Sequence, residues 1–333
     1  MTTLTYLEAA VVGLVQGVTE LFPISSLGHN VLIPALMGGS WAADLNVAEP
    51  ESPYLAFIVG LHVATAIALL VYFWRDWVRI IGGFFSSLRD RRVETADQRL
   101  AWMIVLATIP VGLVGLVAEH PFRVIFGKPI VAAVFLAVNG LILIAGERYR
   151  SRASLAADKR AAVSRQAELV MAGGRPAFPP GPGRPERGQP ERDPEQADAI
   201  ASDRRVSVVG YGKAIVIGSS QILALLAGIS RDGVTMVTGM ARGLSREDAA
   251  RFAFLLSTPV ILAAGVLKIP DLFGPLGNGI HGQILVGSVL SFVGAYFSVR
   301  FLVRYLRTRT LIPFGIYCLV AGLASVVYLG FIK

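Results

Sequence analysis

The chain has 333 residues, of which 54% are hydrophobic and only 16% are charged. A soluble domain needs about 25% charged residues to cover its surface, so this composition excludes an ordinary soluble fold and indicates a membrane protein. The net charge of +8 does not indicate nucleic-acid binding, because the basic residues occur in blocks between apolar stretches. The single cysteine, Cys318, excludes a disulfide framework and a cysteine metal site.

Six apolar runs are long enough to cross a bilayer as helices, which takes about 20 residues each. Two further apolar regions, 5–38 and 208–241, are interrupted midway by polar and turn-forming residues, so we interpret both as re-entrant helical hairpins. The predicted fold class is all-α: a polytopic membrane protein with six transmembrane helices plus two re-entrant helical hairpins. The six predicted spans are 54–74, 100–118, 129–146, 250–268, 283–303 and 311–331.

Lys and Arg residues are spread unevenly among the connecting segments. The rich segments hold six (75–99), twelve (147–212), three (242–251) and four (300–310), whereas the poor segments hold none (39–53 and 269–282) or two (119–128). The positive-inside rule predicts that the rich segments face the cytoplasm. Both termini then lie outside.

The two hairpin regions match each other at an offset of 205 residues, and three predicted spans follow each of them. The matched pairs are Gln16 with Gln221, Ile24 with Ile229, Ser25 with Ser230 and Gly28 with Gly233. Because the predicted topology makes the hairpins enter from opposite sides, the halves are predicted to be inverted repeats. The first half-repeat is 1–150 and the second is 207–333.

The segment between the halves, 151–206, is rich in Pro and Arg. Seven of the eighteen prolines lie between Gly173 and Pro194. Such a stretch buries too little apolar area to order itself fully, so we expect a cytoplasmic linker that is disordered in part and helical at its start. It is either a solvated spacer or a segment that contacts anionic lipid.

The first hairpin carries residues suited to phosphate chemistry. Gln16 and Glu20 are four apart and share one face of a helix. Ser26 and His29 are three apart at the start of the next half-helix, which is the spacing of a nucleophile and its base. Gly28 lets a phosphate approach the main chain of a helix start, whose N–H groups favour an anion.

The second hairpin contributes Arg231, which would complete an anion pocket if the two hairpin tips meet near the midplane. Simpler interpretations exist for these residues. Glu20 and Arg231 alone would make a buried ion pair. Ser25 and Thr235 taken singly are expected to bond their own backbone, and His62 in the span 54–74 is expected to be a packing residue.

The stretch Gln16–His29 and the stretch Ala227–Thr235 resemble the two signature motifs of the BacA-type undecaprenyl-diphosphatases. The first motif has a Glu or Gln four residues before a Glu, and then Pro-x-Ser-Ser-x-Gly-His. The second is usually Pro-Gly-x-Ser-Arg-Ser-Gly. The resemblance covers nearly the whole chain outside residues 151–204.

This resemblance implies a multi-pass enzyme of the bacterial plasma (inner) membrane, with its active site facing the external side. It would hydrolyse undecaprenyl diphosphate to undecaprenyl phosphate and inorganic phosphate, which recycles the lipid carrier for cell-wall peptidoglycan synthesis and gives bacitracin resistance. A divalent cation, Mg²⁺ or Ca²⁺, is implied as cofactor. The expected partners are the polyprenyl diphosphate lipid and the bilayer, with a homodimer left open and no nucleic acid.

The resemblance also assigns roles by position. Ser26 is the expected nucleophile, Glu20 and His29 are the expected acid/base or metal-linked groups, and Arg231 is the expected phosphate clamp. The further expected substrate-binding residues are Ser25, Gly28, Ser230, Gly233 and Thr235. The expected metal ligands are Glu20, Gln16 and Asp232.

Two departures from the motifs bear on that metal set. Gln16 lacks the negative charge of a glutamate, and Asp232 stands where the family usually has Ser. Asp232 would either compensate for Gln16 or pair with Arg231 and weaken its hold on phosphate. Leu27 replaces a Thr and Ala227 a Pro, which changes turn stiffness more than chemistry.

The rival class is transport, because inverted repeats with broken helices are also the architecture of secondary transporters. In that reading the same pocket carries a polyprenyl phosphate or another anionic substrate across the bilayer. A cluster of Ser, His, Glu and Arg is more than an anion carrier needs, so the sequence favours a phosphatase. The covalent route through Ser26 and direct attack by water both stay open.

Overall fold

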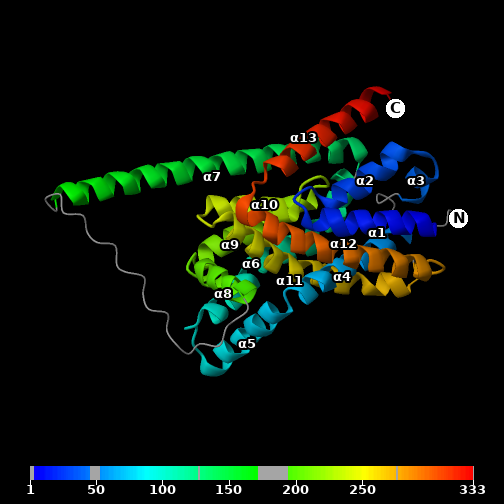
Figure 1. Ribbon diagram of the computed structural model, residues 1–333. Coiled ribbons are helices and arrows are strands. Elements are labelled where there is room, and N and C mark those ends of the chain that lie inside the picture. Colours follow the sequence, from blue (N-terminus) through cyan, green and yellow to red (C-terminus); the bar gives the residue numbers. More distant parts are fainter. Residues whose placement is uncertain (1–3, 46–52, 127, 172–193, 275–276, 333) are drawn as a thin grey trace.

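The computed structural model describes residues 4–45, 53–126, 128–171, 194–274 and 277–332. Within these ranges the chain is helical and has no strand, which confirms the predicted all-α class. Figure 1 shows most of the long helices lying side by side along one direction. The helices up to the linker are α1 (Tyr6–Leu21), α2 (Ser26–Met37), α3 (Gly39–Asp44), α4 (Pro53–Tyr72), α5 (Trp74–Asp90), α6 (Ala96–Phe126) and α7 (Pro129–Met171). The later ones are α8 (Pro194–Ser207), α9 (Tyr211–Ser219), η1 (Ser220–Leu225), α10 (Arg231–Ala241), α11 (Arg246–Phe273), α12 (His281–Thr308), α13 (Ile312–Val327) and η3 (Tyr328–Ile332).

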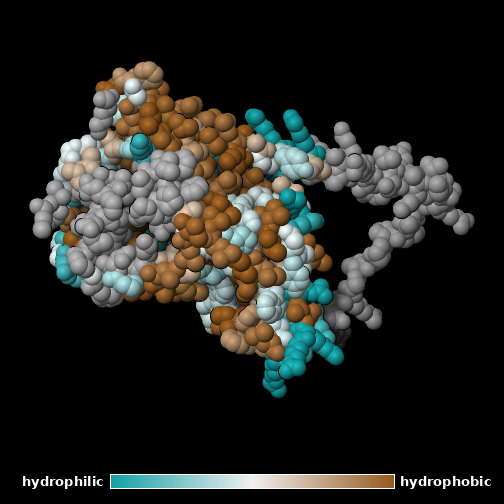
Figure 2. Space-filling model, turned by 180° about the vertical axis from the view of Figure 1, so that it is seen from behind, coloured by the Kyte–Doolittle hydropathy of each residue, from teal (hydrophilic) through white to brown (hydrophobic). Residues whose placement is uncertain are grey.

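Five helices among the described residues are long and apolar enough to cross a membrane. They are the stretches 96–118, 129–153, 246–267, 281–308 and 312–332 of α6, α7, α11, α12 and α13 with η3. Each contains or closely overlaps one of the predicted spans. Their outward faces carry exposed apolar side chains such as Val117 and Leu285, and Figure 2 shows this apolar surface over much of the molecule. A polytopic membrane protein is therefore confirmed.

The remaining predicted span, 54–74, corresponds to α4. This helix does not continue straight, because the chain bends by 84° between Tyr72 and Trp74 and goes on as α5. A second bend, of 101°, separates α8 from α9. The number of six spans therefore stays a prediction.

Both predicted hairpins consist of helices that are too short to span. α1 has 16 residues and α2 has 12, with a break at 22–25. In the second region α9 and η1 precede a break at 226–230, and α10 follows with 11 residues. At about 1.5 Å rise per residue each helix is shorter than the roughly 30 Å of the hydrocarbon core. In Figure 1 the two regions lie toward opposite ends of the bundle.

The first helix of each hairpin packs on a helix of the other half: α1 on α12, and α9 on α6. Glycine permits the close approach in both places. A Cβ on Gly13 would lie 2.4 Å from the backbone oxygen of Gly287, and a Cβ on Gly218 would lie 2.0 Å from that of Ala107. Gly13 and Gly218 are 205 residues apart, the offset found in the sequence. The first helix of each hairpin thus packs on the opposite half in the same way, which supports the inverted-repeat prediction.

The predicted linker contains two helical parts among its described residues. α7 continues without a break to Met171, well beyond the bundle (Figure 1). Residues 194–207 form α8, which packs against α6 and α11 and buries Val206 and Asp203. The linker was predicted to continue to residue 206, but it ends where α8 begins. Most of its prolines lie outside the described residues.

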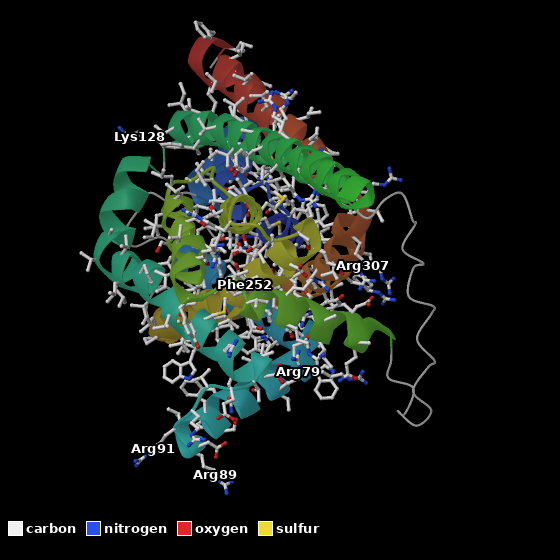
Figure 3. The ribbon with its side chains drawn as sticks, turned by 90° about the vertical axis from the view of Figure 1, so that its left-hand side faces the viewer. Arg79, Arg89, Arg91, Lys128, Phe252 and Arg307 are labelled. Carbon is white, nitrogen blue, oxygen red and sulfur yellow. The ribbon has the colours of Figure 1, made fainter. Side chains whose placement is uncertain are left out.

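A cluster of ion pairs joins four helices at the end of the bundle where α5 and α8 pack. We call this end, which contains Arg79 and Arg251, the basic end. Arg79 of α5 pairs with Asp97 of α6 and Asp203 of α8. Arg251 of α11 pairs with Asp203 at 2.9 Å and with Asp76 of α5 at 2.8 Å. Figure 3 shows Arg79 where these helices converge. The cluster fixes α5 and α8 to the bundle.

We predict that Gly13→Val and Gly218→Val destabilise the fold, because each added side chain would meet backbone atoms across a helix pair. The expected cost is about 1–3 kcal/mol in the free energy of unfolding. Denaturant titration in detergent micelles measures it. The matched control is Gly112→Val in α6, whose Cβ would meet nothing within 4 Å. Equal losses in all three variants would contradict the packing described.

Candidate active site

The broken ends of the two hairpins touch each other. A Cβ on Gly28 of the first hairpin would lie 2.9 Å from the Cα of Gly228 in the second. Asn139 of α7 joins the same two segments: its Nδ2 donates to the Pro23 carbonyl at 2.9 Å, and its Oδ1 accepts from the Ser230 backbone N–H at 3.0 Å. A buried amide that satisfies one group from each half fixes their relative position.

A helix begins at each of these ends with the same cap. The Ser25 hydroxyl accepts from the Gly28 N–H, and the Ser230 hydroxyl accepts from the Gly233 N–H, both at 3.2 Å. Ser25 adopts a φ of 69°, which is unusual for a residue other than glycine. Two helix starts, each with N–H groups that lack acceptors inside the helix, therefore lie together, and they favour an anion.

Glu20, at the end of α1, is the centre of the site. Its Oε1 accepts from Arg231 Nη2, and its Oε2 accepts from the Ser26 hydroxyl and, at 2.9 Å, from Gln16 Nε2. The predicted meeting of Glu20, Ser26 and Arg231 is thus present in the structure. All three residues are less than one-quarter exposed, so these contacts form largely away from solvent.

His29 is turned away from this group. Its Nδ1 donates to the Ser25 carbonyl at 2.7 Å, and its Nε2 lies 2.8 Å from the hydroxyl of Tyr317 in α13, whose ring it also stacks on. The expected hydrogen bond between Ser26 and His29 is therefore replaced by the one from Ser26 to Glu20. Both ring nitrogens of His29 are engaged, and its catalytic role stays a prediction.

His62, which the sequence indicated as a packing residue, belongs to the site, so that interpretation was wrong. Its Nδ1 donates to the Ile58 carbonyl at 2.9 Å, as a packing histidine would. Its other nitrogen, Nε2, lies 3.5 Å from Glu20 Oε2. A proton on Nε2 would make this contact attractive. The sequence contained a signal, a lone histidine in an apolar span, but it was interpreted as packing.

Three more residues of the site were not found from the sequence. Asn139 and Tyr317 lie in apolar spans, and Asn30 donates to Gln16 Oε1 at 2.7 Å. A buried amide within a predicted span would have been a usable signal for Asn139. Tyr317 carried none, because its contact with His29 joins residues that are 288 positions apart.

Thr235 donates to the Arg231 carbonyl at 2.7 Å, as expected for a threonine in a membrane helix.

The three expected metal ligands offer few free oxygens for a divalent cation in this structure. Both Glu20 oxygens are engaged, and Gln16 turns its N–H₂ group, which cannot bind a cation, toward Glu20. Asp232 accepts from the Ser257 hydroxyl through Oδ1, while its buried Oδ2 has no hydrogen-bond partner among the described residues. Mg²⁺ and Ca²⁺ need several oxygen ligands, and these three residues offer one uncommitted carboxylate oxygen. No group of three His, Cys, Asp or Glu suited to a metal occurs in the described part of the chain.

The fold and this cluster together define a class: a polytopic membrane protein in which a serine, a carboxylate and an arginine meet at two broken helices. The chain belongs to the family described as Bacitracin resistance protein BacA, which it matches over residues 9–174 and 190–324. The resemblance predicted from the two motifs is confirmed. The residues between the two matched ranges, 175–189, lie in the Pro-rich segment.

Several relatives share nearly the whole chain. A protein named undecaprenyl-diphosphatase from Mycolicibacterium paratuberculosis is 58% identical over 326 residues, which cover 98% of each chain. Undecaprenyl-diphosphatase 2 of Frankia alni is 54% identical, with 97% of each chain covered. Undecaprenyl-diphosphatase 2 of Burkholderia lata is 39% identical over 92% of this chain and 91% of its own.

We predict that Asp232→Asn raises the free energy of unfolding by about 1 kcal/mol, because it removes the charge of a buried carboxylate that no ion pair holds in the described part of the chain and keeps an acceptor for Ser257. Asp203→Asn is the matched control. That aspartate is equally buried but paired with Arg79 and Arg251, so its replacement should cost about 3–5 kcal/mol. Denaturant titration of both variants in micelles checks the two opposite signs, and a loss of stability in both would contradict the difference.

Proposed function

We propose that this protein hydrolyses undecaprenyl diphosphate to undecaprenyl phosphate and inorganic phosphate in the bacterial plasma membrane. The names of relatives that share up to 98% of the chain support this substrate. The reaction recycles the lipid carrier for cell-wall synthesis. Because bacitracin resistance is part of the family description, an abundant form of this enzyme is expected to confer it.

The observation that carries the proposal is the double engagement of Glu20. One of its oxygens contacts the candidate nucleophile Ser26, and the other contacts the cation Arg231. Both side chains therefore lie within reach of one terminal phosphoryl group. The salt bridge uses Nη2 of Arg231, and a guanidinium has further N–H groups that can donate to phosphate oxygens.

In the proposed first step the Ser26 oxygen bonds to the terminal phosphorus while the bond from that phosphorus to the bridging oxygen breaks. Glu20, which already accepts the hydroxyl hydrogen bond, takes the serine proton and passes it to the leaving undecaprenyl phosphate, so Glu20 is a carboxylate again before the second step. Arg231 and the N–H groups at the starts of α2 and α10 stabilise the charge on the transferring group. The polyprenyl tail stays in the bilayer.

In the second step a water molecule attacks the phosphoseryl group. Its proton is accepted by the carboxylate, phosphate leaves, and the Ser26 oxygen regains a proton, so the cycle consumes one water. The alternative is direct attack by a water that Glu20 deprotonates. Ser25, Gly28, Ser230 and Gly233 are proposed to hold the phosphate through the capped helix starts, and Thr235 is kept as a lesser candidate.

The site is proposed to open toward the external side. The support is the distribution of charge, since the basic end carries the ion cluster and the Lys- and Arg-rich segments, and 39–53 and 269–282 hold no Lys or Arg. A substrate that presents its diphosphate at the outer surface would then enter without crossing the bilayer.

The proposal predicts that Ser26→Ala lowers phosphate release from a polyprenyl diphosphate by at least about 10³-fold, because the attacking oxygen is lost. The measurement is phosphate detection on purified protein in detergent, where no second compartment exists. Ser86→Ala in α5 is the control, since the partners of its hydroxyl, the Gly83 carbonyl and Gln98 Nε2, are not residues of the site. Full activity of Ser26→Ala would exclude the covalent route, and no release by the wild type would favour the transporter.

A divalent cation, Mg²⁺ or Ca²⁺, remains part of the proposal, and no step above depends on it. Because the three expected ligands offer few uncommitted oxygens, we predict weak binding that EDTA removes readily. Phosphate release should then fall and recover when Mg²⁺ or Ca²⁺ is added in excess. Activity that is unchanged by EDTA would contradict the cation requirement.

A further inference from the structure

Helix α5 turns away from α4 at nearly a right angle. Its axis is bent by 84° from that of α4, and Phe73 separates the two helices. If α4 crosses the bilayer, a helix at this angle to it runs close to the plane of the membrane surface. The ion pairs of Arg79 with Asp97 and Asp203 hold α5 at the basic end of the bundle.

One face of α5 is an exposed apolar stripe. Its members recur at intervals of four and three residues, so they lie on one side of the helix. They are Trp74, Val78, Ile81, Phe85 and Leu88, and each is between 48% and 65% exposed. A single exposed apolar side chain is normal on a protein surface. Five large ones along one face of a helix form a patch, and such a patch marks a contact surface.

The opposite face of α5 is held by α6. Ile80 and Ser87 are buried, and the Ser87 hydroxyl accepts from Trp102 Nε1 at 2.9 Å. Gly83 allows the backbone of α6 to come close, since a Cβ there would lie 2.9 Å from the carbonyl carbon of Asp97. The helix therefore cannot rotate to hide its apolar stripe against the protein.

The stripe continues a surface that α4 presents to lipid. Ile67 and Val71, in the last turns of α4 before the bend, are exposed like Trp74 and Val78 in the first turns of α5. Exposed apolar residues on a membrane-spanning helix contact acyl chains. The apolar stripe of α5 adjoins this surface of α4. Lipid is therefore favoured over a protein partner as the layer that covers the stripe.

Residues that are typical of a membrane interface lie at both ends of the stripe. Trp74 stands at the bend, with the Arg75 guanidinium 5.4 Å from its ring centroid. Arg89 and Arg91 are exposed at the far end of the helix, and Figure 3 shows both side chains at the outer tip, directed away from the bundle. Tryptophan is enriched at membrane interfaces, and arginine is attracted to anionic headgroups.

We propose that α5 lies in the headgroup and acyl-chain boundary of the leaflet at the basic end, with its apolar stripe among the acyl chains and its arginines at anionic phospholipid headgroups. Because α5 is tied by ion pairs to α6, α8 and α11, this contact sets the depth at which the bundle sits in the bilayer. The proposal is independent of the phosphatase activity.

Spin labels on α5 test the proposal. Phe85→Cys and Val78→Cys place a nitroxide on the stripe, and Asp90→Cys places one off the stripe, at the exposed last residue of the helix. All three are made in a Cys318→Ser background, which removes the single native cysteine. The full chain is reconstituted in phosphatidylcholine vesicles with and without phosphatidylglycerol. Collision rates with oxygen, which concentrates in lipid, and with a neutral water-soluble nickel chelate are then compared.

The labels at 78 and 85 are expected to favour oxygen several-fold over the label at 90, and to lie deeper when phosphatidylglycerol is present. Labels at 78 and 85 that collide mainly with the nickel chelate would overturn the proposal, because the stripe would then face water. Labels shielded from both reagents would also overturn it, because a protein surface would then cover the stripe. Equal depth in both lipid mixtures would overturn the role of anionic headgroups.

Discussion

The structure depends on one buried ion pair, between Glu20 of the first hairpin and Arg231 of the second. The Glu20 side chain is buried and that of Arg231 is only 20% exposed, so each charge is stabilised largely by the other. The pair joins the two halves of the chain at the point where both are broken. The same carboxylate orients Ser26, which links the requirement for folding to the chemistry proposed for the site.

Small residues make this contact sterically feasible. Gly28 and Gly228 allow the two broken ends to touch, and Gly13 and Gly218 allow each hairpin to lie against the opposite half. Asn139 then satisfies backbone groups of both ends, which would otherwise be unpaired in an apolar interior. The site is thus assembled between the first and second halves of the chain, and neither half contains it alone.

Periodicity and the 205-residue offset were enough to predict the all-α fold, the hairpins and the meeting of Glu20, Ser26 and Arg231. They were not enough for contacts that depend on the exact path of a turn. The three-residue spacing predicted Ser26 bonded to His29, but the Ser25 carbonyl captures the histidine ring and the turn brings Ser26 to Glu20. His62 was missed because its partner is 42 positions away, and no local pattern reports such a contact.

The central claim is tested most directly by a double-mutant cycle on Glu20→Gln and Arg231→Gln, with free energies of unfolding measured in micelles. Each single variant leaves one buried charge without its partner and should lose about 3–5 kcal/mol. The double variant should lose less than the sum of the two by at least about 1 kcal/mol, because neither charge then remains. Losses that add within about 0.5 kcal/mol would show that the two side chains do not interact, and would contradict the account.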